Sequence, residues 1–214
     1  FCCARFCHSR MWGITRNPWN TDFTPGGSSG GSGAALAAGY APLATGSDIG
    51  GSIRIPSSLS GVVGFKPPWA RVPAMAPYNL DQFCHDGPMA RTVADCALLE
   101  DVIAGQHWMD PASLPDPPMV SGSNGSVAGM RVAVCLRLGN WPLDPAVEAN
   151  TMRVAASLRA VGATVDEVTL PWTVDDVWNT AQAHCATTMG AGILAVDRAH
   201  GDLLRDSTRA FAAE

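Results

Sequence analysis

The sequence predicts an α/β protein, and three patterns indicate that class. Apolar runs at 130–136 and 164–168 flank a helical pattern at 145–161, and a helix between two strands is the usual connection of parallel pairing. A second helix pattern follows Thr92, and an alanine-rich third one covers 32–39. A chain of 214 residues is long enough to bury a sizeable core around such elements.

The N-terminal elements follow from glycine and proline positions. Asn17 precedes a proline, which excludes a helix interior and predicts a turn. The alanine-rich segment at 32–39 suits a short helix that ends at Gly39. The apolar run at 61–65 predicts a buried strand, which Lys66 and the two prolines after it close.

A clear amphipathic helix is predicted after Thr92. Thr92 is a suitable N-cap, because Asp95 follows three residues on, and Gly105 ends the helix. The apolar side of this helix comprises Val93, Ala97, Leu98 and Val102. Arg91 and Asp95 have the spacing of a surface ion pair.

The chain is expected to form one domain with a long surface connection. Residues 1–105 carry the glycine-rich loops, residues 106–128 are rich in proline, glycine and serine, and residues 129–214 continue the same domain. Because Phe1 is not a methionine and a helical pattern runs up to the last residue, we expect a fragment that is incomplete at both ends.

Charge and composition exclude several classes of protein. The formal net charge is −5 and Lys66 is the only lysine, which argues against direct nucleic-acid binding. No apolar stretch reaches the length of about 18 residues that a membrane helix needs.

The cysteines favour a reducing environment. Seven cysteines at irregular spacing predict free thiols and a cytoplasmic location rather than a disulfide framework. Cys3, Cys7 and His8 resemble part of a metal site, but no second ligand pair follows, so we expect neither a metal nor a cofactor.

Two glycine–serine loops, at 26–33 and 46–54, carry the functional signal. Glycine allows close approach to the backbone, and successive amides can surround an oxyanion. Ser52 lies at the end of such a run, where a nucleophile belongs, and Ser28 could relay its proton. A flexible linker and a phosphate-binding loop are the alternatives, the second without the lysine that usually follows.

The triplet Cys84-His85-Asp86 looks like a catalytic triad in miniature. Adjacent side chains diverge, however, whereas catalytic triads assemble across a fold. We therefore expect these three residues to lie in a solvated loop.

Five segments, in order, resemble the amidase signature family. They are Asn17-Pro18-Trp19-Asn20, Pro25-Gly26-Gly27-Ser28-Ser29-Gly30-Gly31, Gly46-Ser47-Asp48-Ile49-Gly50-Gly51-Ser52-Ile53-Arg54, Gly64-Phe65-Lys66-Pro67 and Gly87-Pro88-Met89-Ala90-Arg91-Thr92. The resemblance implies a central twisted mixed β-sheet flanked by helices. It also implies hydrolysis of a carboxylic amide through a seryl acyl-enzyme.

The resemblance assigns a role to each loop residue. Ser52 is the nucleophile, and Ser28 is a bridging serine on a cis peptide bond with Gly27. The oxyanion hole is implied to consist of the backbone amides of Ile49, Gly50, Gly51 and Ser52. Ser29 would support the hydrogen bonds, and Asp48 and Arg54 would brace the loop.

The third member of the family's triad is a lysine well upstream of the bridging serine, beyond the start of this sequence. Lys66 belongs to a different segment and does not replace it, so we expect the chain alone to be inactive. The expected partner is a small-molecule amide, and a homodimer is left open. Two alternatives also stay open: a non-catalytic binding or assembly subunit, and an amidase subunit of the glutamyl-tRNA amidotransferase type.

Overall fold

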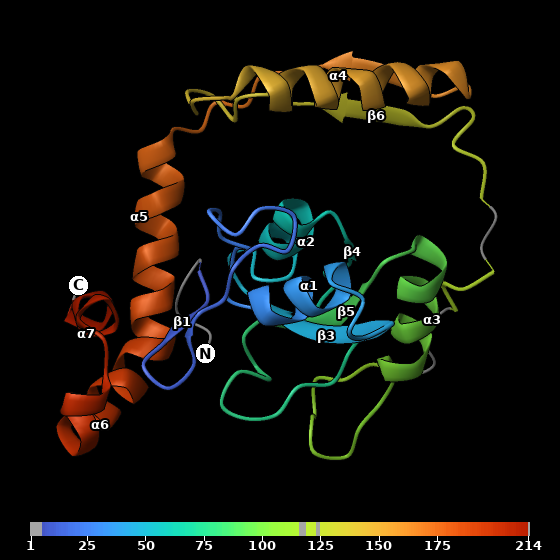
Figure 1. Cartoon of the computed structure of the whole chain (residues 1–214). Helices are drawn as coiled ribbons and strands as arrows, with labels where there is room; N and C mark the ends of the chain where they lie inside the picture. Colours follow the sequence, from blue (N-terminus) through green and yellow to red (C-terminus); the bar gives the residue numbers. More distant parts are fainter. Residues whose placement is uncertain (1–5, 116–118, 123–124, 214) are drawn as a thin grey trace. The chain divides into compact units, whose positions relative to one another are not determined.

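The computed structural model describes residues 6–115, 119–122 and 125–213. The chain divides into two compact units, residues 1–123 with 196–209 and residues 124–195 with 210–214. Each unit combines helices with a small sheet, so the predicted α/β class is confirmed (Figure 1). No helix of the described residues is both long and apolar enough to cross a bilayer.

The first unit is built on a three-stranded antiparallel sheet in the order β3-β5-β4. Its elements before residue 123 are β1 (His8–Ser9), β2 (Gly13–Ile14), α1 (Gly30–Ala37), β3 (Leu43–Asp48), α2 (Arg54–Ser60), β4 (Val63–Gly64), β5 (His85–Ala90) and α3 (Val93–Ile103). Leu36, Ile53 and Met89 form its core and are fully buried. Each comes from a different element, so this core ties α1, the start of α2 and β5 together.

The second unit contains the predicted strand–helix–strand segment. Strands β6 (Arg131–Val134) and β7 (Thr164–Glu167) pair in parallel, and α4 (Pro145–Ala160) connects them. The parallel pairing predicted from sequence is therefore confirmed. Ala155, Ala163 and Val165 form a second core.

The remaining elements are helical. They are α5 (Val174–Cys185), the π-helical turn η1 (Ala186–Gly190), α6 (Ala191–His200), the 3₁₀ turn η2 (Gly201–Leu203) and α7 (Asp206–Ala213). Thr173 begins α5 with a capping box, in which its hydroxyl accepts the Asp176 N–H and its own N–H binds the Asp176 carboxylate.

Helix α3 begins where the sequence predicts, but the side that it buries is not the predicted apolar side. The Thr92 hydroxyl accepts the N–H of Asp95 at 3.1 Å, which confirms the N-cap. Val93 and Val102, on the apolar side that the sequence predicts, are more than 70% exposed and do not face the core. The buried side carries Cys96 and Glu100 instead.

The predicted surface pair between Arg91 and Asp95 is also wrong. Arg91 donates from its guanidinium to the carbonyl oxygen of Ala41 at 2.7 Å. Asp95 instead accepts a hydrogen bond from the Thr92 hydroxyl at 2.7 Å. Arg91 therefore ties the end of β5 to the segment that follows α1.

Candidate active site

The two glycine–serine loops meet in the first unit, and each runs into the first residues of a helix. The first leads into α1 and the second into α2, and these two helices contact each other. A backbone hydrogen bond of 3.2 Å joins the loops, from the N–H of Ser29 to the carbonyl oxygen of Ser52. Two serines that are far apart in sequence are thus brought to one place.

Ser28 is half-buried, and its peptide bond with Gly27 is cis, the peptide geometry that the resemblance implies. The thiol of Cys7 donates to the carbonyl oxygen of Ser28 at 3.2 Å. Sequence reasoning considered Cys7 only as a metal ligand and missed this contact. Nothing in the local sequence around either residue signals the contact, because 21 positions separate them.

Ser29 fixes the first loop against β3. Its hydroxyl accepts the N–H of Ser47 at 3.2 Å and donates to the carbonyl oxygen of Ser47 at 3.4 Å. Gly46 makes this contact possible, since a β-carbon at that position would lie 2.8 Å from the Ser29 hydroxyl. The supporting position expected for Ser29 therefore has a structural basis.

Asp48 organises the second loop. Its fully buried carboxylate accepts backbone N–H groups from Gly51 at 2.7 Å, Ile53 at 3.1 Å and Arg54 at 3.2 Å. The Arg54 guanidinium donates to both carboxylate oxygens, at 2.8 and 3.0 Å. Burial alone would raise the pKa of Asp48, but the Arg54 hydrogen bonds and the Gly51 amide outweigh it, so the pKa lies below its ordinary value.

This network refines the candidate oxyanion hole. The N–H of Gly51 donates to Asp48, so Gly51 braces the loop, and its φ of +118° suits glycine. Ile49, Gly50 and Ser52 lie in the same turn, where Gly50 is exposed and the other two are half-buried. Backbone amides close in sequence to a serine are the groups that acyl transfer requires, so this turn stays the candidate oxyanion hole.

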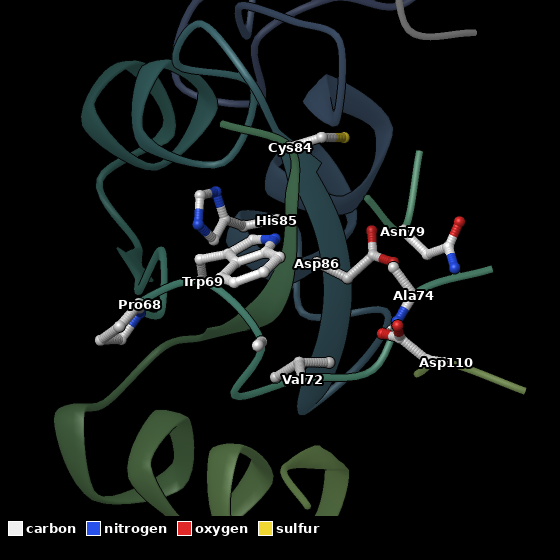
Figure 2. A pocket seen from close by; sticks show the side chains of 10 residues that line it. Pro68, Trp69, Val72, Ala74, Asn79, Cys84, His85, Asp86 and Asp110 are labelled. Carbon is white, nitrogen blue, oxygen red and sulfur yellow. Dashed lines mark hydrogen bonds between the residues drawn. The ribbon is translucent and has the colours of Figure 1, made fainter. Parts of the chain in front are cut away.

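The prediction of a solvated loop at Cys84-His85-Asp86 is wrong for two of its residues. His85 and Asp86 begin strand β5, where His85 pairs with Asp48 and Asp86 pairs with Ser47. His85 is only 8% exposed. In Figure 2 the imidazole lies on one side of the strand near Trp69, while the Asp86 carboxylate points away, towards Asn79.

An open cavity of about 680 Å³ lies beside the first loop. It is lined by Ser29, Thr45, Gly46, Ser47, Val72, Pro73, Asp86 and Ile103. Asp86 is the only charged residue in this lining, and burial raises the pKa of its carboxyl. A cavity of this volume can hold a small molecule next to Ser29 and Ser47, whereas neither Ser28 nor Ser52 is among its lining residues.

Lys66 lies outside this cavity. Its ammonium donates to the carbonyl oxygen of Pro67 at 2.9 Å, and burial and the charge of Arg54 lower its pKa. Cys3 lies outside the described residues. Within them, no group of three or more metal-ligating side chains converges.

A family model and curated relatives both relate this chain to amidases. The family model described as Amidase matches residues 1–209. The chain is 46% identical over 166 residues to the A component of glutamyl-tRNA(Gln) amidotransferase from Chloroflexus aggregans, covering 75% of this chain and 33% of the relative. It is 44% identical over 171 residues to the same component from Symbiobacterium thermophilum, covering 77% and 34%. The chain thus spans about a third of the length of these curated relatives.

Solved structures agree with the sequence relatives. A bacterial aryl acylamidase belonging to the amidase signature enzymes superposes with a TM-score of 0.89 at 29% identity, covering 98% of this chain and 46% of that one. The 6-aminohexanoate cyclic dimer hydrolase complexed with substrate gives a TM-score of 0.77 at 30% identity, with the same coverage. Both are similar to this chain over nearly all of its length.

Proposed function

Because the chain belongs to the amidase family, we propose that it carries the serine pair of an enzyme that hydrolyses carboxylic amides. The observation that supports this most directly is the backbone hydrogen bond from Ser29 to Ser52, which joins the two loops. Ser28 directly precedes Ser29, so this contact brings the segment that carries the proposed relay next to the proposed nucleophile.

In the proposed reaction the Ser52 hydroxyl attacks the carbonyl carbon of the amide. Its proton passes through Ser28 to a lysine amine supplied from outside these 214 residues. The carbonyl oxygen becomes an oxyanion, which the amides of Ile49, Gly50 and Ser52 stabilise by about 2.7–4 kcal/mol each. The C–N bond then breaks, the leaving amine takes the proton, and water hydrolyses the acyl-enzyme. This chemistry needs no metal or cofactor.

The lysine must be neutral to accept a proton, so burial has to lower its pKa from about 10.4. Lys66 does not supply this base, because its ammonium contacts Pro67 rather than either serine loop. The substrate is proposed to be a small amide, the location cytoplasmic, and a homodimer stays open.

The test compares single-serine variants of the full-length protein by release of amine or ammonia from amide substrates. Ser52→Ala should abolish turnover, and Ser28→Ala should lower it by about 10²–10⁴-fold, the range for a lost proton-transfer group. Ser58→Ala is the matched control, because Ser58 lies exposed on α2, and it should retain normal activity. Near-normal hydrolysis by Ser52→Ala would refute the assignment.

The curated relatives favour a second candidate within the same chemistry. Several A components of this amidotransferase are 41–46% identical to the chain, so it could supply ammonia to a partner that amidates a tRNA-linked glutamate. The purified protein with its co-purifying partners is incubated with glutamine and glutamyl-tRNA. Formation of glutaminyl-tRNA supports this role, whereas hydrolysis of simple amides without it supports the first.

A non-catalytic subunit of the same fold is the remaining alternative. A serine-reactive phosphonate distinguishes it, because covalent labelling requires an activated nucleophile. Labelling at Ser52 that disappears in Ser52→Ala supports the enzyme. A full-length protein that stays unlabelled supports a binding or assembly role.

A further inference from the structure

We propose that His85 is a positioning residue for the second serine loop. The neutral imidazole, buried opposite Asp48 in the ladder of β3 and β5, keeps the Asp48 carboxylate and its bound amides in place, and protonation of His85 loosens them. The inference rests on the proposed function in one respect only: the loosened loop is expected to change the reactivity of Ser52.

The first observation is the position of His85 on the sheet. Asp48 ends β3 and His85 begins β5, and the two residues are directly paired. Paired residues of antiparallel strands project their side chains to the same face, with β-carbons about 4.5–5.5 Å apart. The imidazole is therefore a neighbour of the group that organises the loop.

The second observation is the proton arrangement of the ring. Nδ1 lies 2.9 Å from the carbonyl oxygen of Phe83. A carbonyl oxygen can only accept, so Nδ1 carries the hydrogen of the neutral ring and Nε2 is the site that gains a proton. The contact with Phe83 fixes the ring orientation without using Nε2.

The third observation is the charge around the ring. The charged groups that act on His85 are Asp48 of β3 and Lys66 of the segment after β4. The Asp48 carboxylate is already paired with Arg54 and also acts on the charge of Lys66. A charged imidazole would add a third cation, which competes for Asp48 and is repelled by Lys66.

The other charged groups near β5 are placed differently. Asp86 is adjacent on the strand and feels the charge of His85, but its carboxylate points to the opposite side. Helix α3, which packs on β5, carries Asp95, Glu100 and Asp101, and these do not act on His85. Asp48 is therefore the anion that a protonated His85 would draw.

Burial and the charge of Lys66 lower the pKa of His85, against smaller opposing effects of Phe83 and Asp48. The neutral ring is thus the stable form in the folded protein at neutral pH. As the pH falls below the ordinary histidine value of about 6.5, the unfolded chain takes up the proton first, so the folded state loses stability. The expected consequence is a loop that opens more often in acid.

The test measures hydrogen exchange of the loop amides, which does not depend on catalysis. The protection factor of the peptide covering 46–54 is compared at pH 7.5 and pH 5 in the full-length protein. The wild type should lose protection at pH 5, because the folded state binds the His85 proton less tightly than the unfolded chain does. His85→Asn keeps a donor for Phe83 but cannot be charged, and its protection should be the same at both pH values. His107→Gln, at an exposed histidine, should behave like the wild type.

A second measurement needs no variant to fold. The ring proton signal of His85 in the wild type should titrate with a midpoint below 6.5 and follow the loss of loop protection. Protection that is independent of pH in the wild type, or that falls equally in His85→Asn, would overturn the inference. Phosphonate labelling of Ser52 at pH 7.5 separately tests the proposed function, so the two proposals fail independently.

Discussion

Glu100 is a carboxylic acid on the inner side of α3. It is 4% exposed, and its Oε2 has no hydrogen-bond partner among the residues that the structure describes. Burial, with a contribution from the charge of Asp101, raises its pKa to about 7. A buried carboxyl of this kind is stable as the neutral acid and costs free energy when it ionises.

We expect Glu100→Gln to remove a pH dependence of stability. The folded pKa lies above the unfolded value of 4.5, so the folded state holds the proton more tightly. Its stabilising effect is complete below pH 4.5 and is lost as the pH rises through about 7. Urea unfolding at pH 5 and pH 8 should therefore show a smaller loss of stability with pH in the variant than in the wild type.

Glu167→Gln serves as the control, because Glu167 lies exposed on β7. It should keep the wild-type pH dependence. Should Glu100→Gln also keep it, the carboxyl of Glu100 would not be the group that titrates.

The sequence could identify the loop residues but not all of their neighbours. Ser28 and Ser52 each lie inside a continuous motif, and the Asp48–Arg54 pair lies within one of these motifs, so each could be identified locally. Cys7 and His85 reach the same region only through the fold, and the local patterns that include them do not indicate these contacts.

At the scale of elements, β5 depends on a glycine at its centre. A β-carbon at Gly87 would meet the backbone carbonyl oxygen of Phe65 and would lie 2.6 Å from the ring of Pro67. We expect Gly87→Ala to destabilise the first unit by about 1–3 kcal/mol through overpacking. Gly31→Ala is the matched control, because nothing lies within 4 Å of the added carbon and alanine favours helix α1.

Chemical unfolding of both glycine variants checks this prediction. Gly31→Ala should be neutral or more stable by up to about 1 kcal/mol. Equal stability of the two variants would show that β5 shifts to make room.

The sequence predicted helices better than it predicted strands. The cap at Thr92 is a local hydrogen bond, so α3 was found with its correct start. Its buried side was assigned wrongly because exposed valines and a buried Glu100 reverse the usual pattern. Strand β5 was not predicted from sequence, because Pro88 lies inside it and proline is rare in a strand paired on both sides.

At the scale of the whole molecule, each unit has its own apolar core. We expect Met89→Ala to increase hydrogen exchange in β3 and β5 and to leave β6 and β7 unchanged. Removing this fully buried side chain costs about 2–5 kcal/mol in the first unit. Val165→Ala should have the reciprocal effect, with a smaller magnitude because fewer atoms are removed.

Hydrogen-exchange mass spectrometry of the full-length protein measures both variants. If either change raised exchange in all four strands alike, the units would unfold as one.

The overall class was predictable from sequence because the strand–helix–strand pattern of the second unit is local. The division of the chain into two units was not, because it depends on which distant segments share contacts.

The alternation of His85 and Asp86 along β5 has a consequence for which mutations this protein can tolerate. One residue faces the Asp48 network and the next lines the cavity beside Ser29, so the strand serves two chemical compartments at once. Substitutions alter one compartment and spare the other. The insertion or deletion of a single residue before His85 would exchange the two faces and disable both together. The pairing register of β5 therefore tolerates less change than the identities of its side chains do.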